Sequence, residues 1–196
     1  MTDYVYDLDP QNHNYTNFTH IFRTYGVPYK IVEIGAYAGA TTTKLIDFIG
    51  PVIGSLEYIA IDPYSTSLDV KEDLEKIHRV FLDRVNSSPY GHCVKLYRER
   101  SFDGLVRLRN EGFRPQLIYI DGDHTASTVL ADLVLSFDIL EKGGVIVCDD
   151  VGTWKYNSDP QMSPKMAVDN FLMCNWSKLD IIELPVAHNQ IAFIKL

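Results

Sequence analysis

The chain has 196 residues, a formal net charge of −8 at pH 7 and an apolar fraction of 46%. That length suits one domain with a single core, and the ordinary balance of apolar and charged residues excludes a disordered or fibrous chain. Because the charge is acidic, we expect no broad phosphate-binding surface and no nucleic-acid partner. The N-terminus lacks a basic and apolar leader, and the cysteines lack metal-finger spacing, so we expect a cytoplasmic protein with reduced thiols and no membrane contact.

The N-terminal part of the chain predicts one amphipathic helix. In the segment NFTHIFRTYG, apolar side chains recur at helical spacing from Phe18 to Tyr25, and Gly26 follows as an end signal. We expect this helix to belong to a cap segment, residues 1–29, in front of a single domain, residues 30–196.

Seven short apolar runs follow and predict the strands of one sheet: residues 30–34, 57–61, 92–97, 116–120, 145–148, 179–184 and 190–194. Segments of helical period lie between them at 40–50, 69–85 and 163–176, and Ser163 with Pro164 marks the start of the last. This alternation is typical of parallel strands covered by helices on both faces. The last two runs are too close for a crossover, so we expect an antiparallel hairpin. The expected fold is α/β, with a mostly parallel seven-stranded sheet.

The first strand runs into the next helix through a glycine turn, IVEIGAYAGATTT. Absent side chains at Gly35 and Gly39 let a ligand approach the backbone, which favours a nucleotide-like ligand. The dinucleotide pattern G-x-G-x-x-G is excluded, because Tyr37 and Ala40 stand where its other glycines would be. A tight turn without a ligand is the alternative.

The remaining pattern, E-x-G-x-x-x-G, resembles the first motif of class I S-adenosylmethionine-dependent methyltransferases, and the resemblance extends over residues 30–196. It implies a Rossmann-like fold and a cofactor whose methionine part lies at Glu33, Gly35, Ala36 and Gly39. It also implies that Asp62 holds both ribose hydroxyls, since one carboxylate can accept from two vicinal hydroxyls. Ser101 and Phe102 would contact the adenine, and a helix N-cap is the alternative for Ser101 and Asp103.

Acidic residues follow two of the predicted strands. The stretch YIDGDHTAS places Asp121 directly after the fourth strand, and Asp149 and Asp150 follow the fifth. Ligands of open α/β sheets bind at the carboxyl ends of the strands, where these carboxylates would converge if the two strands are neighbours. Like charges raise one another's pKa unless a cation neutralises them, and oxygen ligands suit a hard divalent ion. The pattern predicts a metal, with Mg²⁺ first; a solvated pair of turn acids is the alternative for Asp149 and Asp150.

The stretches DGDH and KGGVIVCDDV resemble the metal-dependent O-methyltransferases of the catechol, caffeoyl-coenzyme A and macrocin types. The resemblance implies Asp121, Asp149 and Asp150 as metal ligands and His124 as general base, a role that a neutral imidazole can fill near neutral pH. The Asp-Asp pair and the histidine are typical of the macrocin-like side, since catechol-type enzymes have Asp-Asn and a lysine. The alternative for His124 is a helix-start residue bonded to its own turn. Asp123 is expected to cap that turn or to support a ligand.

These motifs together predict transfer of a methyl group from S-adenosylmethionine to a hydroxyl of a small molecule, a sugar or a catechol-like diol. Substrate recognition is expected from the cap and from the loop 151–165, where Trp154 and Tyr156 would close over a ring; ordinary packing is the alternative for Trp154. A homo-oligomer is implied by the resemblance alone. Two rival interpretations stay open: a metal-independent methyltransferase, and a cofactor-binding or regulatory protein without catalysis.

Overall fold

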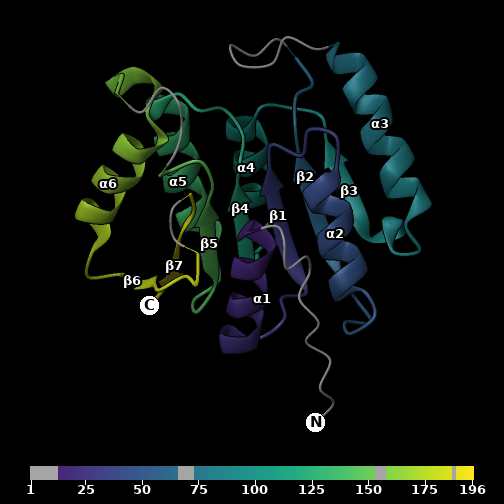
Figure 1. Ribbon diagram of the computed structural model, residues 1–196, viewed down its shortest axis with the longest axis horizontal. Helices are drawn as coiled ribbons and strands as arrows, with labels where there is room; N and C mark the ends of the chain where they lie inside the picture. The colour runs from purple at the N-terminus through teal and green to yellow at the C-terminus, as the bar shows by residue number, and fades with distance from the viewer. Residues whose placement is uncertain (1–12, 66–72, 153–157, 187–188) are drawn as a thin grey trace.

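The computed structural model describes residues 13–65, 73–152, 158–186 and 189–196, which fold around one central sheet (Figure 1). The strands are β1 (Lys30–Ile34), β2 (Glu57–Ile61), β3 (Val94–Tyr97), β4 (Leu117–Ile120), β5 (Val145–Cys148), β6 (Leu179–Ile182) and β7 (Ile191–Lys195). The α-helices are α1 (His13–Tyr25), α2 (Ala40–Ile49), α3 (Leu74–Ser87), α4 (Ser101–Asn110), α5 (Ala126–Ile139) and α6 (Pro164–Asn175). Short 3-10 turns precede β3 (Gly91–Cys93) and α6 (Pro160–Met162).

The strand order is β3-β2-β1-β4-β5-β7-β6, and every pair is parallel except the two that β7 makes. The expected sheet, mostly parallel with a C-terminal antiparallel hairpin, is confirmed. The chain leaves β1 and β4 toward opposite edges, so the switch point at which such sheets bind ligands lies between these two strands. The register aligns the last residues of β1, β4 and β5, which brings Gly35, Asp121 and Asp149 to the same level beyond the sheet.

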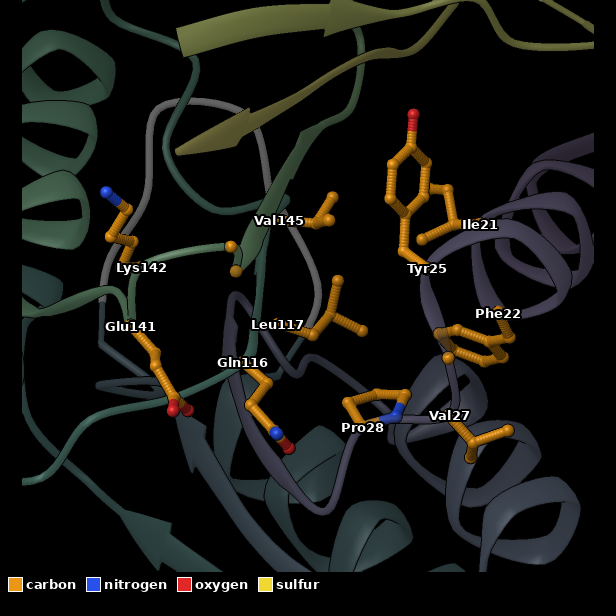
Figure 2. A pocket seen from close by; sticks show the side chains of 13 residues that line it. Ile21, Phe22, Tyr25, Val27, Pro28, Gln116, Leu117, Glu141, Lys142 and Val145 are labelled. Carbon is orange, nitrogen blue, oxygen red and sulfur yellow. The ribbon is translucent and has the colours of Figure 1, made fainter. Parts of the chain in front are cut away.

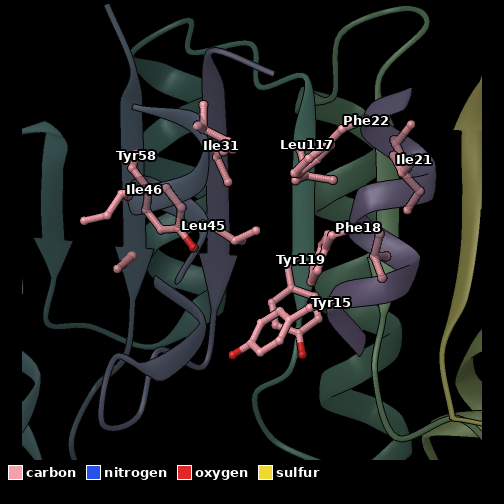
Figure 3. Close-up of a cluster of buried hydrophobic side chains, with 14 of the residues drawn as sticks. Tyr15, Phe18, Ile21, Phe22, Ile31, Leu45, Ile46, Tyr58, Leu117 and Tyr119 are labelled. Carbon is pink, nitrogen blue, oxygen red and sulfur yellow. The ribbon is translucent and has the colours of Figure 1, made fainter. Parts of the chain in front are cut away.

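Among the described residues, three helices cover each face of the sheet (Figure 1). Helices α1, α2 and α3 bury apolar side chains against one face, and α4, α5 and α6 against the other. Figure 3 shows side chains of α1 directed toward Leu117 and Tyr119 of β4, and Phe18 meets Tyr119 edge-on with ring centroids 5.2 Å apart. Of the segment expected to form a cap, α1 is therefore a layer of the core, and residues 1–12 lie outside the described residues.

Two element boundaries differ from the predictions for local reasons. The helix expected from residue 69 begins at Leu74, because the carboxylate of Asp73 accepts two backbone N–H groups of the first turn; residues 66–72 lie outside the described part of the chain. The strand expected from residue 92 begins at Val94, because Gly91–Cys93 form a 3-10 turn. Within the described ranges, no helix is long and apolar enough to cross a membrane.

Candidate active site

A cavity of about 730 Å³ lies along the carboxyl ends of β1, β2 and β4 and the first turns of α4 and α5. Its size suits a cofactor or another small ligand. The predicted site residues that line it are Gly35, Asp62, Ser101, Phe102, Asp121 and His124. The fold therefore brings cofactor candidates and acid-cluster candidates from separate strands to one space.

A smaller hollow of about 160 Å³ lies at the opposite edge of the sheet, where α1 ends and the central strands begin (Figure 2). Tyr25, Pro28, Gln116 and Glu141 are among the residues that line it. Ligands of open α/β sheets bind at the carboxyl ends of the strands, and this hollow lies at their amino ends. We therefore take the larger cavity as the candidate active site.

The glycine turn after β1 passes very close to the end of β4. Gly35 has a φ of 86°, in the left-handed region, and its N–H donates to the carbonyl of Ile61 at 2.9 Å. A Cβ at this position would meet the carbonyl oxygen of Asp121 at 2.0 Å. Only glycine allows this approach, so the cavity has bare backbone at the turn and Asp121 directly beside it.

Asp62 lies on the cavity wall with both carboxylate oxygens hydrogen-bonded. One oxygen accepts the backbone N–H of Tyr37 at 2.8 Å, and the other accepts that of Tyr64 at 2.8 Å. The hydroxyl of Tyr64 donates to the carbonyl of Tyr37 at 2.8 Å, which ties the turn after β1 to the loop after β2. Burial raises the pKa of Asp62, and these two N–H groups lower it. The carboxylate is therefore held in one orientation before any ligand binds.

Ala36 and Gly39 of the glycine turn, and Glu33 of β1 just before it, are not among the residues that line the cavity. Glu33 is 1% exposed and accepts hydrogen bonds from the hydroxyls of Thr42 and Tyr58. Burial raises the pKa of Glu33 to about 7, although both hydroxyls act in the opposite direction. Its position does not support the expected direct contact with a ligand. Its hydrogen bonds connect β1 with α2 and β2 inside the fold.

The adenine candidates lie where α4 begins. The N-cap position of α4 is Arg100, without a capping side chain, so the alternative that Ser101 or Asp103 caps the helix is wrong.

Asp132 of α5 also lines the cavity, and the sequence analysis did not predict it. It is 1% exposed, and neither carboxylate oxygen makes a hydrogen bond to the described residues. Burial raises its pKa to about 7, and the nearby Ser101 hydroxyl lowers it. The sequence did contain a signal for Asp132, because a charged residue on the inward face of an apolar helix is unusual.

Asp121, His124 and Asp150 form a cluster in which one ligand atom of each lies within 4.8 Å of the others. Nε2 of His124, from the loop between β4 and α5, lies 3.0 Å from Oδ2 of Asp150. The backbone of Asp150 has a φ of 57°, in the left-handed region, just beyond β5. Asp123 caps its own turn by accepting the N–H of Thr125 at 2.6 Å. The acid cluster thus joins the ends of two neighbouring strands.

Asp149 lies beside this acid cluster and is 7% exposed. Its Oδ2 accepts from the hydroxyl of Tyr119 and from Nε2 of Gln190, the latter at 3.1 Å. Its Oδ1 accepts from the N–H of Asp150 at 2.8 Å and from Nδ2 of Asn189 at 2.7 Å. The alternative of a solvated turn pair is therefore wrong for Asp149. The sequence led us to expect Asp149 as the third member of the cluster, but the third member is His124.

The electrostatics of the acid cluster follow from crowding. Burial and the neighbouring Asp149 raise the pKa of Asp121 well above its usual range. The hydrogen bond from His124 lowers the pKa of Asp150. Crowded carboxylates are stabilised by positive charge, and a donor set of carboxylate oxygens with one imidazole nitrogen fits a divalent cation.

Comparison with known protein families identifies this arrangement. A family profile described as "Methyltransferase domain" matches residues 32–151, from β1 to the end of the acid cluster. The chain belongs to the methyltransferase-domain family. The expectation drawn from the glycine turn is therefore confirmed at the level of the family, and the turn, Asp62 and the acid cluster all lie within the matched range.

The chain is also similar to a viral protein in sequence and to solved O-methyltransferases in structure. It is 30% identical to Uncharacterized protein R132 of Acanthamoeba polyphaga mimivirus over 153 residues, which are 78% of this chain but only 63%, less than two thirds, of that relative. The O-methyltransferase TomG of Streptomyces achromogenes, solved with SAM, is 14% identical with a TM-score of 0.69, over 90% of this chain and 76% of that one. CalS11, a TDP-rhamnose 3'-O-methyltransferase of calicheamicin biosynthesis, is 16% identical with a TM-score of 0.63, over 89% and 76%. At these identities the solved structures show a shared fold.

The β4–α5 loop forms one end of the cavity. Gly122, Asp123 and His124 all line it. Trp154 and Tyr156, which were expected to close over a substrate, lie outside the described residues. The cavity therefore has an imidazole and carboxylates at one end and the glycine turn with Asp62 at the other.

Proposed function

We propose that this methyltransferase transfers the methyl group of S-adenosylmethionine to a hydroxyl group of a small molecule, with a divalent cation held beside the acceptor. The observation that carries the proposal is the shared cavity, whose wall includes Gly35 and Asp62 as well as Asp121 and His124. A cofactor at the first pair and an acceptor at the second would occupy one cavity. Holding both reactants in this way supplies much of the rate of a bimolecular transfer.

Cofactor binding is assigned to the glycine turn and to Asp62. Each carboxylate oxygen of Asp62 already accepts one backbone N–H and retains lone-pair capacity for one more donor. Two vicinal ribose hydroxyls would use that capacity, in charge-assisted hydrogen bonds. Because Asp62 is held before binding, little ordering of the side chain opposes the association.

The cation site is assigned to Asp121 and Asp150, with Asp149 beside them. Mg²⁺ is the first candidate for a carboxylate-rich site, and the imidazole of His124 in the same cluster also suits Mn²⁺. A cation held there would lower the pKa of a coordinated acceptor hydroxyl.

His124 is assigned the proton. In the reaction, the acceptor oxygen forms a bond to the methyl carbon while the carbon–sulfur bond breaks, and its electron pair goes to sulfur to give a neutral thioether. The hydroxyl proton has to leave, and a neutral imidazole accepts it near neutral pH. Asp150, 3.0 Å from Nε2 of His124, would stabilise the imidazolium that forms.

Calorimetric titration with S-adenosylmethionine tests the cofactor assignment. Asp62→Ala is expected to weaken binding by about tenfold or more, because two charge-assisted hydrogen bonds are lost. Asp180→Ala, which removes an exposed carboxylate of β6, serves as the control and is expected to bind like the parent. A parent protein that binds no S-adenosylmethionine would contradict the assignment.

Methyl transfer to a panel of catechols and sugars, with and without a chelator, tests the assignments of the cation, the acceptor and His124. Loss of activity with the chelator and its return with Mg²⁺ are expected. Activity indifferent to the chelator would favour the metal-independent interpretation. His124→Gln separates two roles for the imidazole: a base is needed for turnover but not for cation binding, whereas a ligand is needed for both. The Asp-Asp pair leads us to expect turnover first with the sugars.

A further inference from the structure

A buried series of hydrogen bonds connects α1 with Asp149, which lies beside the acid cluster. Nδ2 of Asn17 donates to Oε1 of Gln190 at 3.0 Å, and Nε2 of Gln190 donates to Oδ2 of Asp149 at 3.1 Å. Asn17 is 1% exposed and Gln190 is 3% exposed. Burying two primary amides costs free energy unless their hydrogen bonds are made. These hydrogen bonds therefore run through the core from α1 to the carboxylate of Asp149.

The orientation of the Asn17 amide is determined by backbone. Its Oδ1 accepts the N–H of Val186 at 3.1 Å, and its Nδ2 donates to the carbonyl of the same residue at 2.8 Å. A flipped amide would set donor against donor and acceptor against acceptor. The second hydrogen of Nδ2 must therefore point to Gln190.

The orientation of the Gln190 amide follows in turn. Because its Oε1 accepts from Asn17, its Nε2 faces Asp149 and presents a donor to that carboxylate. Asn189, which directly precedes Gln190, donates to both residues of the acid pair, Asp149 and Asp150. Its Nδ2 lies 2.7 Å from Oδ1 of Asp149 and 3.3 Å from Oδ1 of Asp150. The segment before β7 thus holds the acid pair through side-chain amides.

The location of α1 makes this connection possible. Phe18, next to Asn17 in sequence, packs edge-on against Tyr119 of β4 (Figure 3). The hydroxyl of Tyr119 donates a hydrogen bond to Asp149. The same helix therefore reaches Asp149 by two routes, one through apolar packing and one through amides.

We propose that Asn17 is a positioning residue of the cation site, which acts through Gln190 to fix the orientation of Asp149. The inference rests on the proposed function, because it concerns the cation assigned to that site. Groups that orient the neighbours of a metal typically change its affinity when they are removed.

Titration calorimetry of the full chain with Mn²⁺ provides the test. Asn17→Asp keeps the shape of the side chain but cannot donate, so Gln190 either loses its partner or turns its oxygen toward Asp149. We expect Mn²⁺ to bind about tenfold or more weakly. Binding of S-adenosylmethionine, at the other end of the cavity, is expected to be unchanged, which distinguishes the effect from general unfolding. If Asn17→Asp does not fold, Asn17→Ala allows the same measurement.

Two further variants separate positioning from stability. Ile21→Val removes one methylene from the same helix and should lower the stability of the protein, yet should leave Mn²⁺ affinity unchanged. In a Gln190→Leu background, Asn17→Asp should weaken Mn²⁺ binding no further, since its effect passes through Gln190. Mn²⁺ bound equally well by Asn17→Asp and the parent, or additive effects of the two changes, would overturn the inference alone. A parent that binds no Mn²⁺ would overturn the proposed cation as well.

Discussion

The hydroxyl of Tyr119 lies between the carboxylates that end two neighbouring strands, 2.9 Å from Oδ2 of Asp121 and hydrogen-bonded to Oδ2 of Asp149. A hydroxyl has one hydrogen, so it can satisfy only one of the two at a time. Burial and both aspartates raise the pKa of Tyr119 well above its usual range, so the phenol keeps its proton. The two aspartates therefore share one donor.

Tyr119→Phe should destabilise the protein by about 1–3 kcal/mol in the absence of divalent cations, because both carboxylates lose that donor. The deficit should shrink at saturating Mg²⁺, since a cation bound by the acid cluster supplies the positive charge instead. Urea unfolding with and without Mg²⁺ measures it. Tyr97→Phe removes another buried tyrosine hydroxyl, 3.0 Å from Glu111, and its deficit should not respond to Mg²⁺. A Tyr119→Phe deficit that Mg²⁺ leaves unaltered would argue against a cation in this cluster.

Gly35→Ala should abolish cofactor binding and lower the free energy of unfolding by roughly 2–4 kcal/mol. The new Cβ would lie 2.0 Å from the carbonyl oxygen of Asp121, at a φ of 86° that an alanine rarely adopts. Calorimetry with S-adenosylmethionine and urea unfolding measure the two effects. Gly54→Ala is the matched control, because its Cβ would meet nothing within 4 Å. Retained binding in Gly35→Ala would mean that the cofactor does not approach this turn.

The sequence predicted that the acidic residues lie together at the carboxyl edge of the sheet, but it did not predict the side-chain contacts that they make there. The first five apolar runs are parallel strands, so an acidic residue that follows one of them has to lie at the carboxyl edge of the sheet. That reasoning brought Asp121, Asp149 and Asp150 to one edge. The contact of His124 with Asp150 depends on the left-handed backbone of Asp150, which no spacing of residues predicts.

Buried polar residues were the hardest to predict. Asn17 and Gln190 are 173 positions apart and meet only because α1 packs on the centre of the sheet. Glu33 belongs to a motif that suggested a ligand contact, yet its place in the alternation of β1 directs it to Thr42 of α2 and Tyr58 of β2. Such partners are determined by tertiary topology, which a local pattern does not contain.

The cap of α6 was predicted from two residues and can be tested directly. The Ser163 side chain accepts the N–H of Met166 at 3.2 Å, and Pro164 takes the first helical position. Ser163→Ala should lower the free energy of unfolding by about 1 kcal/mol, because the first turn loses this acceptor. Ser163→Thr keeps the hydroxyl and should retain most of the stability. Equal losses in urea unfolding of the two variants would mean that the tight packing around this buried residue outweighs the cap.

Glu33 should make the stability of the protein depend on pH. Its pKa is about 7 in the folded protein, compared with an ordinary value of 4.5. Between these values the folded state keeps a proton that the unfolded chain has lost. The free energy of unfolding therefore falls as pH rises through this window and stays at the lower level above it.

Glu33→Gln removes this titration but keeps an oxygen that can accept from Thr42 and Tyr58. The variant should match the parent near pH 4 and exceed its free energy of unfolding by up to about 3 kcal/mol above pH 7. Urea unfolding at a series of pH values gives the difference directly. Glu183→Gln, which changes an exposed glutamate, serves as the control. A Glu33→Gln difference that stays constant from acid to neutral pH would mean that this carboxyl ionises alike in the folded and unfolded states, so that its burial carries no electrostatic cost.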